Sequence, residues 1–158
     1  MSLSLRIARP SDVGEILAVQ RGGDGATTER FRAWLVQAMD AENERVCVAQ
    51  LDERIVGWAA TRRFDEAAEG APAGHYLMGV RIMTAHRGKS VGSMLVAARL
   101  ELIRRAGGDQ AYYFTNARNT ASIATHRRWG FEEQARAPRF RGVPFGGGEG
   151  ILFAARLG

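Results

Sequence analysis

Cysteine is almost absent from the sequence: Cys47 is the only one in 158 residues. A single thiol forms no internal disulfide, and no cluster of Cys and His residues has the spacing of metal ligands. No apolar run approaches the roughly 18 residues that span a bilayer, and the N-terminus has no long apolar stretch of the kind found in signal peptides. We therefore expect no membrane span, no bound metal and a cytoplasmic location.

Acidic residues are also fewer than basic ones. The chain has 22 Lys and Arg residues against 17 Asp and Glu residues, which gives a formal net charge of +5. This excess favours an anionic partner such as a nucleic acid, an acidic lipid or a small molecule that carries phosphate, and composition does not choose among them. The remaining composition, 46% hydrophobic and 25% charged, is that of a globular protein. The length predicts one domain over residues 1–158.

The hydrophobic pattern predicts a mixed order of strands and helices. Apolar runs and alternation predict strands at residues 3–7, 46–49, 55–59, 75–83, 110–115, 131–136 and 150–156. Helical spacing predicts a short helix after Pro10, a second from Thr27, a long one that begins near residue 90 and ends before Gly107, and a short one from about Asn119 to Trp129. Loops are predicted at residues 22–25, 65–74 and 139–148. This order predicts an α/β fold in which helices cover both faces of one mixed sheet.

Chemistry-bearing residues are few among the apolar runs. Cys47 lies between two valines, so we interpret it as a small core residue rather than a nucleophile. Phe31, Trp34 and Trp58 are interpreted as packing residues rather than as a platform for stacking nucleic-acid bases.

The segment from Arg87 to Ser93 lies between a predicted strand and a predicted helix. A helix N-terminus presents unpaired N–H groups and the positive end of a dipole, so a glycine-containing turn before it suits a phosphate. Arg87 and Lys89 add positive charge. Neither GxxxxGK(S/T) nor GxGxxG is present. Taken alone, the segment is explained equally well if Gly88 and Gly92 only permit a tight turn and close packing of the helix.

A second segment favours the interpretation of the first as a phosphate-binding site. Residues 119–131 predict a helix that begins on an amide side chain and ends at a glycine before an aromatic residue. Together the two segments resemble the GNAT superfamily of acetyl-CoA-dependent N-acetyltransferases, whose signature is R/Q-x-x-G-x-G/A followed by N-x-x-A-x-x-x-Y-x-x-x-G-F. Residues 87–92 match the first pattern, except that Ser90 stands where the family usually has Gly. In the second pattern, Ser122 replaces Ala and His126 replaces Tyr. The positions matched in register are Asn119, Ile123, Gly130 and Phe131.

The resemblance implies a mostly antiparallel sheet of about seven strands and transfer of an acetyl group from acetyl-CoA to a primary amine. It implies that the strand ending at Ile82 and Met83 bonds the pantetheine arm, and that an N–H of Ile82 or its neighbour stabilises the oxyanion. Asn119 would bond the pantetheine chain, with Ser122 near the same surface. The resemblance assigns the diphosphate to the loop residues Arg87, Gly88, Lys89, Ser90, Val91, Gly92 and Ser93. We expect this cradle to require that Ser90 avoid a positive φ, which glycine tolerates better.

The implied chemistry benefits from a proton donor for the coenzyme A thiolate. His126 occupies the family's Tyr position and is the candidate catalytic residue, because an imidazole titrates near neutral pH. The alternative is that His126 packs near Trp129 and transfers no proton. No acidic residue lies in residues 75–83 or 110–115, so the general base is unassigned. His75 could act as the base through a water molecule, but we prefer to interpret it as an exposed residue at the start of a strand.

Two other functions stay open. A non-catalytic sensor of coenzyme A or acyl-CoA would keep the cradle and lack the chemistry, and Ser90, His126 and the missing strand glutamate favour it. A nucleic-acid-binding domain would use the excess of basic residues, with an affinity that falls as salt rises. The preferred prediction is an acetyltransferase that takes acetyl-CoA and an amine and binds neither nucleic acid nor membrane. The identity of the amine and the oligomeric state, a homodimer included, stay open.

Overall fold

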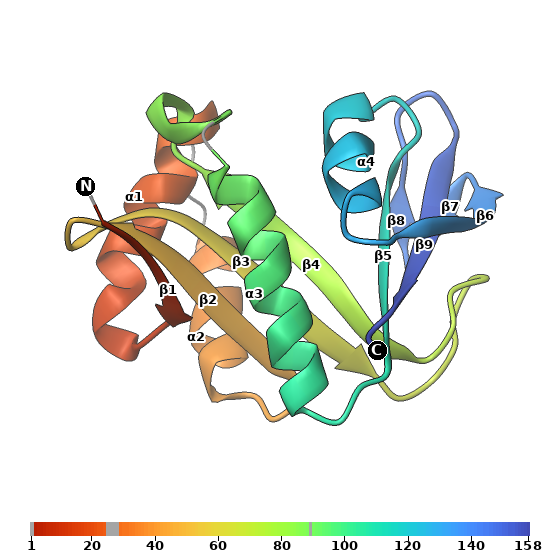
Figure 1. The fold of residues 1–158 in the computed structure, drawn as a ribbon, viewed down its shortest axis with the longest axis horizontal. Coiled ribbons are helices and arrows are strands. Elements are labelled where there is room, and N and C mark those ends of the chain that lie inside the picture. Colours follow the sequence, from red (N-terminus) through yellow and green to blue (C-terminus); the bar gives the residue numbers. More distant parts are fainter. Residues whose placement is uncertain (1, 25–28, 89) are drawn as a thin grey trace. The chain divides into compact units, whose positions relative to one another are not determined.

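The computed structural model describes residues 2–24, 29–88 and 90–158. The predicted helix start at Thr27 and the predicted site residue Lys89 lie outside these residues. The elements in chain order are β1 (Leu3–Ile7), α1 (Val13–Asp24), α2 (Glu29–Asp40), β2 (Glu44–Leu51), β3 (Arg54–Phe64), β4 (Gly74–Ile82), α3 (Val91–Arg105), β5 (Gln110–Asn116), α4 (Thr120–Arg127), β6 (Glu132–Ala137), β7 (Arg139–Phe140), β8 (Val143–Pro144) and β9 (Gly150–Arg156) (Figure 1). Short 3-10 turns occupy Pro10–Asp12 and Thr84–His86.

One sheet holds seven of the strands, in the order β1-β2-β3-β4-β5-β9-β6, and β7 pairs with β8 in a separate hairpin. The pairing of β4 with β5 is parallel, whereas β1–β2, β5–β9 and β6–β9 are antiparallel. The predicted fold class, a mixed and mostly antiparallel sheet with helices, is confirmed. Contacts divide the chain into two compact units, Met1–Thr61 with Met78–Arg99 and Arg62–Leu77 with Leu100–Gly158. One domain over residues 1–158 stays a prediction.

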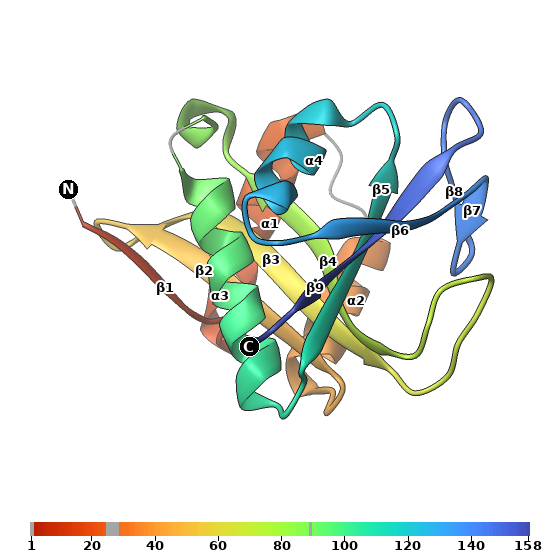
Figure 2. The ribbon, with the colours of Figure 1, turned by 45° about the vertical axis from the view of Figure 1, so that its right-hand side comes forward.

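In the first unit, α1 and α2 lie on one face of the strands and α3 lies on the other (Figures 1 and 2). Trp58 of β3 anchors the face under α1 and α2, where its ring is 5.4 Å from Phe31 and 5.5 Å from Trp34. This confirms that these aromatic residues pack. The rest of this core is aliphatic and comprises Ala8, Ile16, Val19, Leu35, Ala38, Val46, Val48, Ile55 and Ala60.

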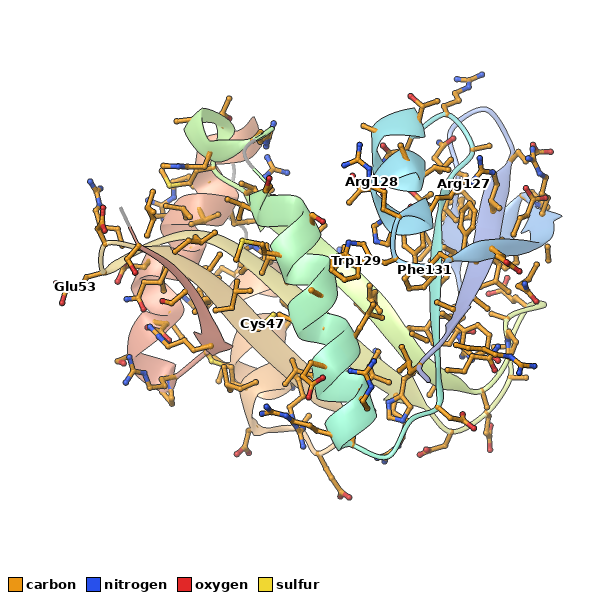
Figure 3. All side chains as sticks on the ribbon, viewed as in Figure 1. Cys47, Glu53, Arg127, Arg128, Trp129 and Phe131 are labelled. Carbon is orange, nitrogen blue, oxygen red and sulfur yellow. The ribbon has the colours of Figure 1, made fainter. Side chains whose placement is uncertain are left out.

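The other face of the first unit brings α3 close to the sheet. Gly57 permits this approach, because a Cβ there would lie 3.2 Å from the Arg81 carbonyl oxygen and 3.4 Å from Leu95. Cys47 lies on β2 beside α3 (Figure 3) and is 2% exposed. Burial raises the pKa of the Cys47 thiol, and the charge of Arg99 opposes that rise. Cys47 is therefore a core residue, as predicted.

In the second unit, β5 pairs with β9 along its whole length, from Gln110↔Arg156 to Asn116↔Gly150. Side chains alternate between the faces of a strand, so β5 carries two different aromatic clusters. Tyr113 packs against Phe153 on one face. Tyr112 and Phe114 contact Tyr76 on the other. The second unit thus has an aromatic core on both sides of β5.

Two segments differ from the sequence prediction. Gly22 and Gly23 were expected in a loop, but α1 continues to Asp24, since a helical glycine costs only about 1 kcal/mol relative to alanine. The segment 139–148 was expected to be a loop, yet it contains the β7–β8 hairpin, whose turn residues Arg141 and Gly142 have φ of 48° and 79°. Positive φ at both turn positions matches the twist of a two-residue hairpin.

Distant contacts hold that hairpin in place. Arg141 Nη2 donates to the carbonyl oxygens of Glu66 at 2.8 Å and Pro72 at 2.7 Å. The Arg141 guanidinium also lies 3.9 Å from the centre of the Phe64 ring. These partners lie about seventy residues away in the chain, so no local pattern could predict them.

Candidate functional site

The loop between β4 and α3 leads into the N-terminus of a helix. After the Thr84–His86 turn, Gly88 has φ of 75°, and α3 begins at Val91. The Met94 N–H donates to the Ser90 carbonyl oxygen at 3.0 Å, which is the first bond of the helix. The amides of Val91, Gly92 and Ser93 therefore precede the first intrahelical donor. Such amides are the groups with which a helix N-terminus binds an anion.

Ser90 has the backbone conformation that we expected it to avoid, because its φ is 69°. The expectation was wrong because the left-handed region is open to L-residues at a cost of roughly 1–2 kcal/mol. Ser90 therefore takes a backbone conformation that the family's usual glycine adopts without that cost. Gly88 and Ser90, which precede and follow Lys89 in the sequence, both have positive φ despite the substitution.

Gly92 lies where α3 approaches the end of β4. A Cβ at this position would lie 3.3 Å from Cδ1 of Ile82, a tight contact. A Cβ at Gly88 would meet no atom within 4 Å, so at that position the positive φ alone favours glycine. The packing explanation of the glycines thus applies to Gly92, and the turn explanation to Gly88.

The second half of β4 presents main chain to solvent. Gly79 and Val80 are exposed, Val80 at 44%. The Met83 N–H donates to the Val56 carbonyl oxygen at 2.8 Å, and Arg87 Nε donates to the Ile82 carbonyl oxygen at 3.1 Å. The Met83 amide is thus already engaged, and the role of Ile82 or its neighbour as the oxyanion donor stays a prediction.

The start of α4 is fixed by Asn119. Its Oδ1 accepts the Ser122 N–H at 3.2 Å, which makes Asn119 the N-cap of the helix. The Ser122 hydroxyl lies 2.7 Å from the Tyr113 hydroxyl of β5. Asn119 is exposed and Ser122 is half-buried. Both polar side chains therefore have structural partners, and their role toward pantetheine stays a prediction.

His126 is buried one turn further along α4, with 5% of its surface exposed. Its imidazole stacks on the Tyr113 ring with centroids 3.7 Å apart and planes 5° from parallel. His126 Nδ1 lies 2.8 Å from the Ser122 carbonyl oxygen. A carbonyl oxygen only accepts, so Nδ1 carries the proton in this contact. Proton transfer by His126 stays a prediction.

Comparison with known families decides the class of this chain. The sequence model of the acetyltransferase (GNAT) family matches residues 13–131. The chain belongs to the GNAT family. Family membership makes it an acetyltransferase. No curated protein matches its sequence.

Solved structures share the GNAT fold over nearly the whole chain. The ribosomal-protein-alanine N-acetyltransferase of Brucella melitensis is 25% identical, with a TM-score of 0.75 and coverage of 98% of this chain and 99% of the other. YncA of Salmonella typhimurium, solved with its cofactor acetyl-CoA, is 20% identical, with a TM-score of 0.76 and coverage of 100% and 95%. The PaiA N-acetyltransferase of Thermoplasma acidophilum, in complex with coenzyme A, is 12% identical, with a TM-score of 0.71 and coverage of 99% and 100%.

Figure 3 labels the end of the second GNAT motif, where α4 ends at Arg127 and the chain continues through Arg128 and Trp129. All three are exposed, Trp129 at 38%. Phe131, two residues later, is 2% exposed and packs edge-on against Tyr113. The motif's Gly130 has φ of 87°, so the chain reverses there from an exposed helix end into the core.

His75, the weaker candidate for a base in this GNAT chain, is a half-buried residue at the start of β4. Burial, followed by the charge of Arg63, lowers the pKa of His75 below its ordinary value of 6.5. The ring packs closely, since a Cβ on Gly108 would lie 2.8 Å from His75 Cδ2. Its role as a base stays a prediction.

Two further features bear on the site. Among the residues that the structure describes, no three His, Cys, Asp or Glu side chains gather in a way that could bind a metal ion, and no helix is long and apolar enough to cross a membrane.

Sequence analysis missed the role of Tyr113. Alternation along β5 and the four-residue spacing of Ser122 and His126 were the signals that could have placed these side chains on facing surfaces.

Proposed function

We propose that this GNAT acetyltransferase moves the acetyl group of acetyl-CoA to a primary amine of a small molecule, a peptide or a protein. The amine attacks the thioester directly, a tetrahedral intermediate forms, and the coenzyme A thiolate leaves. The observation that carries the proposal is the N-terminus of α3, where the amides of Val91, Gly92 and Ser93 precede the first intrahelical bond. A diphosphate fits such a group of donors.

Main-chain groups do most of the binding in this proposal. Backbone N–H groups between Gly88 and Ser93 hold the diphosphate, and the side chains of Arg87 and Lys89 add positive charge. Arg87 already donates its Nε to the Ile82 carbonyl oxygen, so its terminal nitrogens are the ones assigned to phosphate. The main-chain bonds to pantetheine are assigned to the carbonyl oxygens of Ile82 and Met83, each of which accepts one bond in the structure and has a second lone pair. The roles of Asn119 and Ser122 toward that arm rest on the sequence motif alone.

The chemical step needs two kinds of help. The oxyanion needs a fixed donor, for which we assign the Ile82 N–H. The thiolate needs a proton, for which we assign His126. Neither step requires a metal ion, and the general base that prepares the amine stays unassigned.

The test is to measure coenzyme A release from acetyl-CoA in the presence of a panel of amines. We expect release that depends on the amine and a rise in melting temperature with acetyl-CoA alone. Gly92→Leu should lower the affinity for acetyl-CoA at least about tenfold, because a side chain there presses on Ile82 and displaces the first turn of α3, whose amides hold the diphosphate. Gly14→Leu is the matched control, since Gly14 lies in the first turn of α1 and a Cβ there meets no atom within 4 Å.

The outcomes separate the alternatives. Binding of acetyl-CoA without release for any amine would favour the sensor of coenzyme A. Equal affinity in the Gly92→Leu and wild-type proteins would contradict the assignment of the cradle. Binding of random duplex DNA that weakens steeply between two salt concentrations, with no effect of acetyl-CoA, would favour a nucleic-acid-binding domain.

A further inference from the structure

Tyr113, Ser122 and His126 form a polar cluster inside the second unit that the GNAT motif does not explain. We propose that Tyr113 is a positioning residue that holds the His126 imidazole as the Nδ1-protonated tautomer, so that Nε2 is the nitrogen that exchanges a proton with the reacting groups. The second half of this statement rests on the proposed acetyl transfer. The first half concerns the folded protein alone and can be tested without turnover.

The ring stack fixes the plane of the imidazole. The Tyr113 and His126 rings are 3.7 Å apart and nearly parallel, at 5°. Phe131 meets the imidazole edge-on, with centroids 5.5 Å apart and planes at 73°. Rotation of the imidazole about χ2 would break both ring contacts in this buried setting. The imidazole plane is therefore defined by contacts from β5 and from the segment after α4.

The hydrogen bonds fix which nitrogen carries the proton. Nδ1 lies 2.8 Å from the Ser122 carbonyl oxygen and 3.5 Å from the Ser122 hydroxyl oxygen. The carbonyl oxygen has lone pairs and no hydrogen, so Nδ1 must donate. The Tyr113 hydroxyl, 2.7 Å from the Ser122 hydroxyl, ties the residue one turn before His126 to β5. Tyr113 thus restrains His126 through its ring and through Ser122.

The tautomer decides the direction of proton flow. A neutral imidazole with its proton on Nδ1 has a lone pair on Nε2, so it begins as a proton acceptor. After the amine attacks the thioester carbon, its nitrogen carries a positive charge, and Nε2 takes one proton from it. The C–S bond then breaks, the electron pair goes to sulfur, and the imidazolium returns that proton from Nε2 to the thiolate. His126 ends neutral, with its Nδ1 proton unchanged.

This path differs from that of a residue that only donates. A residue that only donates must take up a new proton from solvent after each turnover. His126 instead takes its proton from the same amine that forms the amide. The proton count balances, because the amine loses one proton and the thiol gains it. Neutral His126 is thus the competent form, and the orientation of its ring matters more than its charge.

The direct test is nitrogen-15 NMR of the histidine rings. The chain has only three histidines, so the variants His75→Gln and His86→Gln assign the His126 signals in the ligand-free protein. We expect a protonated Nδ1 and an unprotonated Nε2 for His126. Tyr113→Leu should produce a mixture of tautomers, whereas Tyr113→Phe, which keeps the ring, should retain the Nδ1 proton.

Kinetics with an amine that the panel identifies provide the second readout. Tyr113→Leu should lower kcat about tenfold to a hundredfold, within the range of acid–base catalysis, and change the KM for acetyl-CoA less than about threefold. Tyr113→Phe should recover most of the lost kcat. Tyr112→Leu is the matched control, because Tyr112 directly precedes Tyr113 on β5 and stacks on Tyr76 on the opposite face. Its His126 tautomer and kcat should match the wild type.

The results distinguish this proposal from the function on which it rests. A His126 protonated on Nε2 in the wild type, or an unchanged tautomer in Tyr113→Leu, would overturn the positioning role whatever the activity. A Phe variant as impaired as the Leu variant would also contradict it, since the ring would then not be what positions His126. If no amine is acetylated, the proposed function fails, and the NMR result still decides what Tyr113 does. If Tyr113→Leu does not fold, Tyr113→Met replaces it, because it also removes the ring, and it should give the same mixture of tautomers.

Discussion

Arg99 Nη1 donates a hydrogen bond to the Met78 carbonyl oxygen at 2.9 Å, which ties the middle of α3 to β4. Arg99 is 1% exposed, and its Nε also donates to the Leu95 carbonyl oxygen at 3.2 Å. A buried guanidinium is costly unless its N–H groups are bonded. These carbonyl groups therefore help the protein to retain a charge in its core, and they set the position of the helix whose N-terminus forms the proposed cradle.

Replacing Arg99 with methionine should destabilise the fold. The substitution keeps the apolar stem but removes the donor to the part-buried Met78 carbonyl oxygen, which typically costs about 1–3 kcal/mol. Urea unfolding monitored by tryptophan fluorescence measures the free energy of unfolding. Arg105→Met is the control, because Arg105 lies on the same helix with its side chain 75% exposed, and a loss no larger than in that control would contradict the structural role of Arg99.

Replacing Ser90 with glycine should stabilise the protein by roughly 0.5–1 kcal/mol, because glycine avoids the cost of a left-handed backbone and returns only part of that gain as unfolded-state entropy. Ser93→Gly, in the first turn of α3, should instead cost about 1 kcal/mol. Urea midpoints of the two variants give the comparison. If both substitutions destabilised equally, Ser90 would not carry the strain that its φ implies.

Stability should fall as the pH drops below about 6.5, partly through His75. Its pKa is lower in the folded protein than the ordinary value of 6.5, so below that value the unfolded chain binds a proton more readily than the folded one. The contribution of His75 is complete above this pH and is lost below it. We expect His75→Gln to lose less melting temperature between pH 7.5 and pH 5.5 than the wild type does.

Arg63→Met offers an independent check of the cause. The charge of Arg63 also lowers the pKa of His75, after burial. Removing that charge should therefore reduce the loss of melting temperature in acid, though less than removal of the imidazole. An unchanged acid response in both variants would assign it to other groups.

Asp12 should stabilise the N-terminal part of the chain through its ion pair with Arg6. Its carboxylate accepts from Arg6 at 2.7 and 2.9 Å and from the Arg9 N–H at 2.7 Å. The hydrogen bond from Arg6 holds the pKa of Asp12 below its ordinary value of 3.8. This stability is present above that value and is lost as the pH falls through the lower folded pKa.

Asp12→Asn should therefore cost about 1–3 kcal/mol at neutral pH and should weaken the dependence of stability on pH below 4. Asp65→Asn is the control, because the Asp65 side chain is 76% exposed and pairs with Arg63 on the surface, where such pairs contribute at most about 1 kcal/mol. Guanidinium unfolding at pH 7 and pH 3 measures both effects. The Asp12 side chain is 7% exposed. An equal loss of unfolding free energy in the two variants would show that this burial does not strengthen its ion pair with Arg6.

Local patterns predict the elements of this fold and the residues of its two motifs. Alternation and helical spacing depend on neighbours a few residues apart, so β1, β9 and α3 follow from the sequence. The φ of Ser90 and the hairpin at Arg141 do not, because long-range packing decides whether a left-handed residue is tolerated. The stack of His126 on Tyr113 joins a strand to a helix. Patterns within each element indicate the face on which each side chain lies, but they do not reveal that the two rings meet.

The position of Cys47 makes one assay of this enzyme unusually clean. Colorimetric thiol reagents react with the thiolate form of a cysteine. Cys47, the single cysteine of the sequence, is buried, and burial raises the pKa of its thiol, which therefore stays protonated. A colorimetric count of thiols in a reaction mixture of the folded enzyme therefore reports the coenzyme A that is released, with no background from the protein.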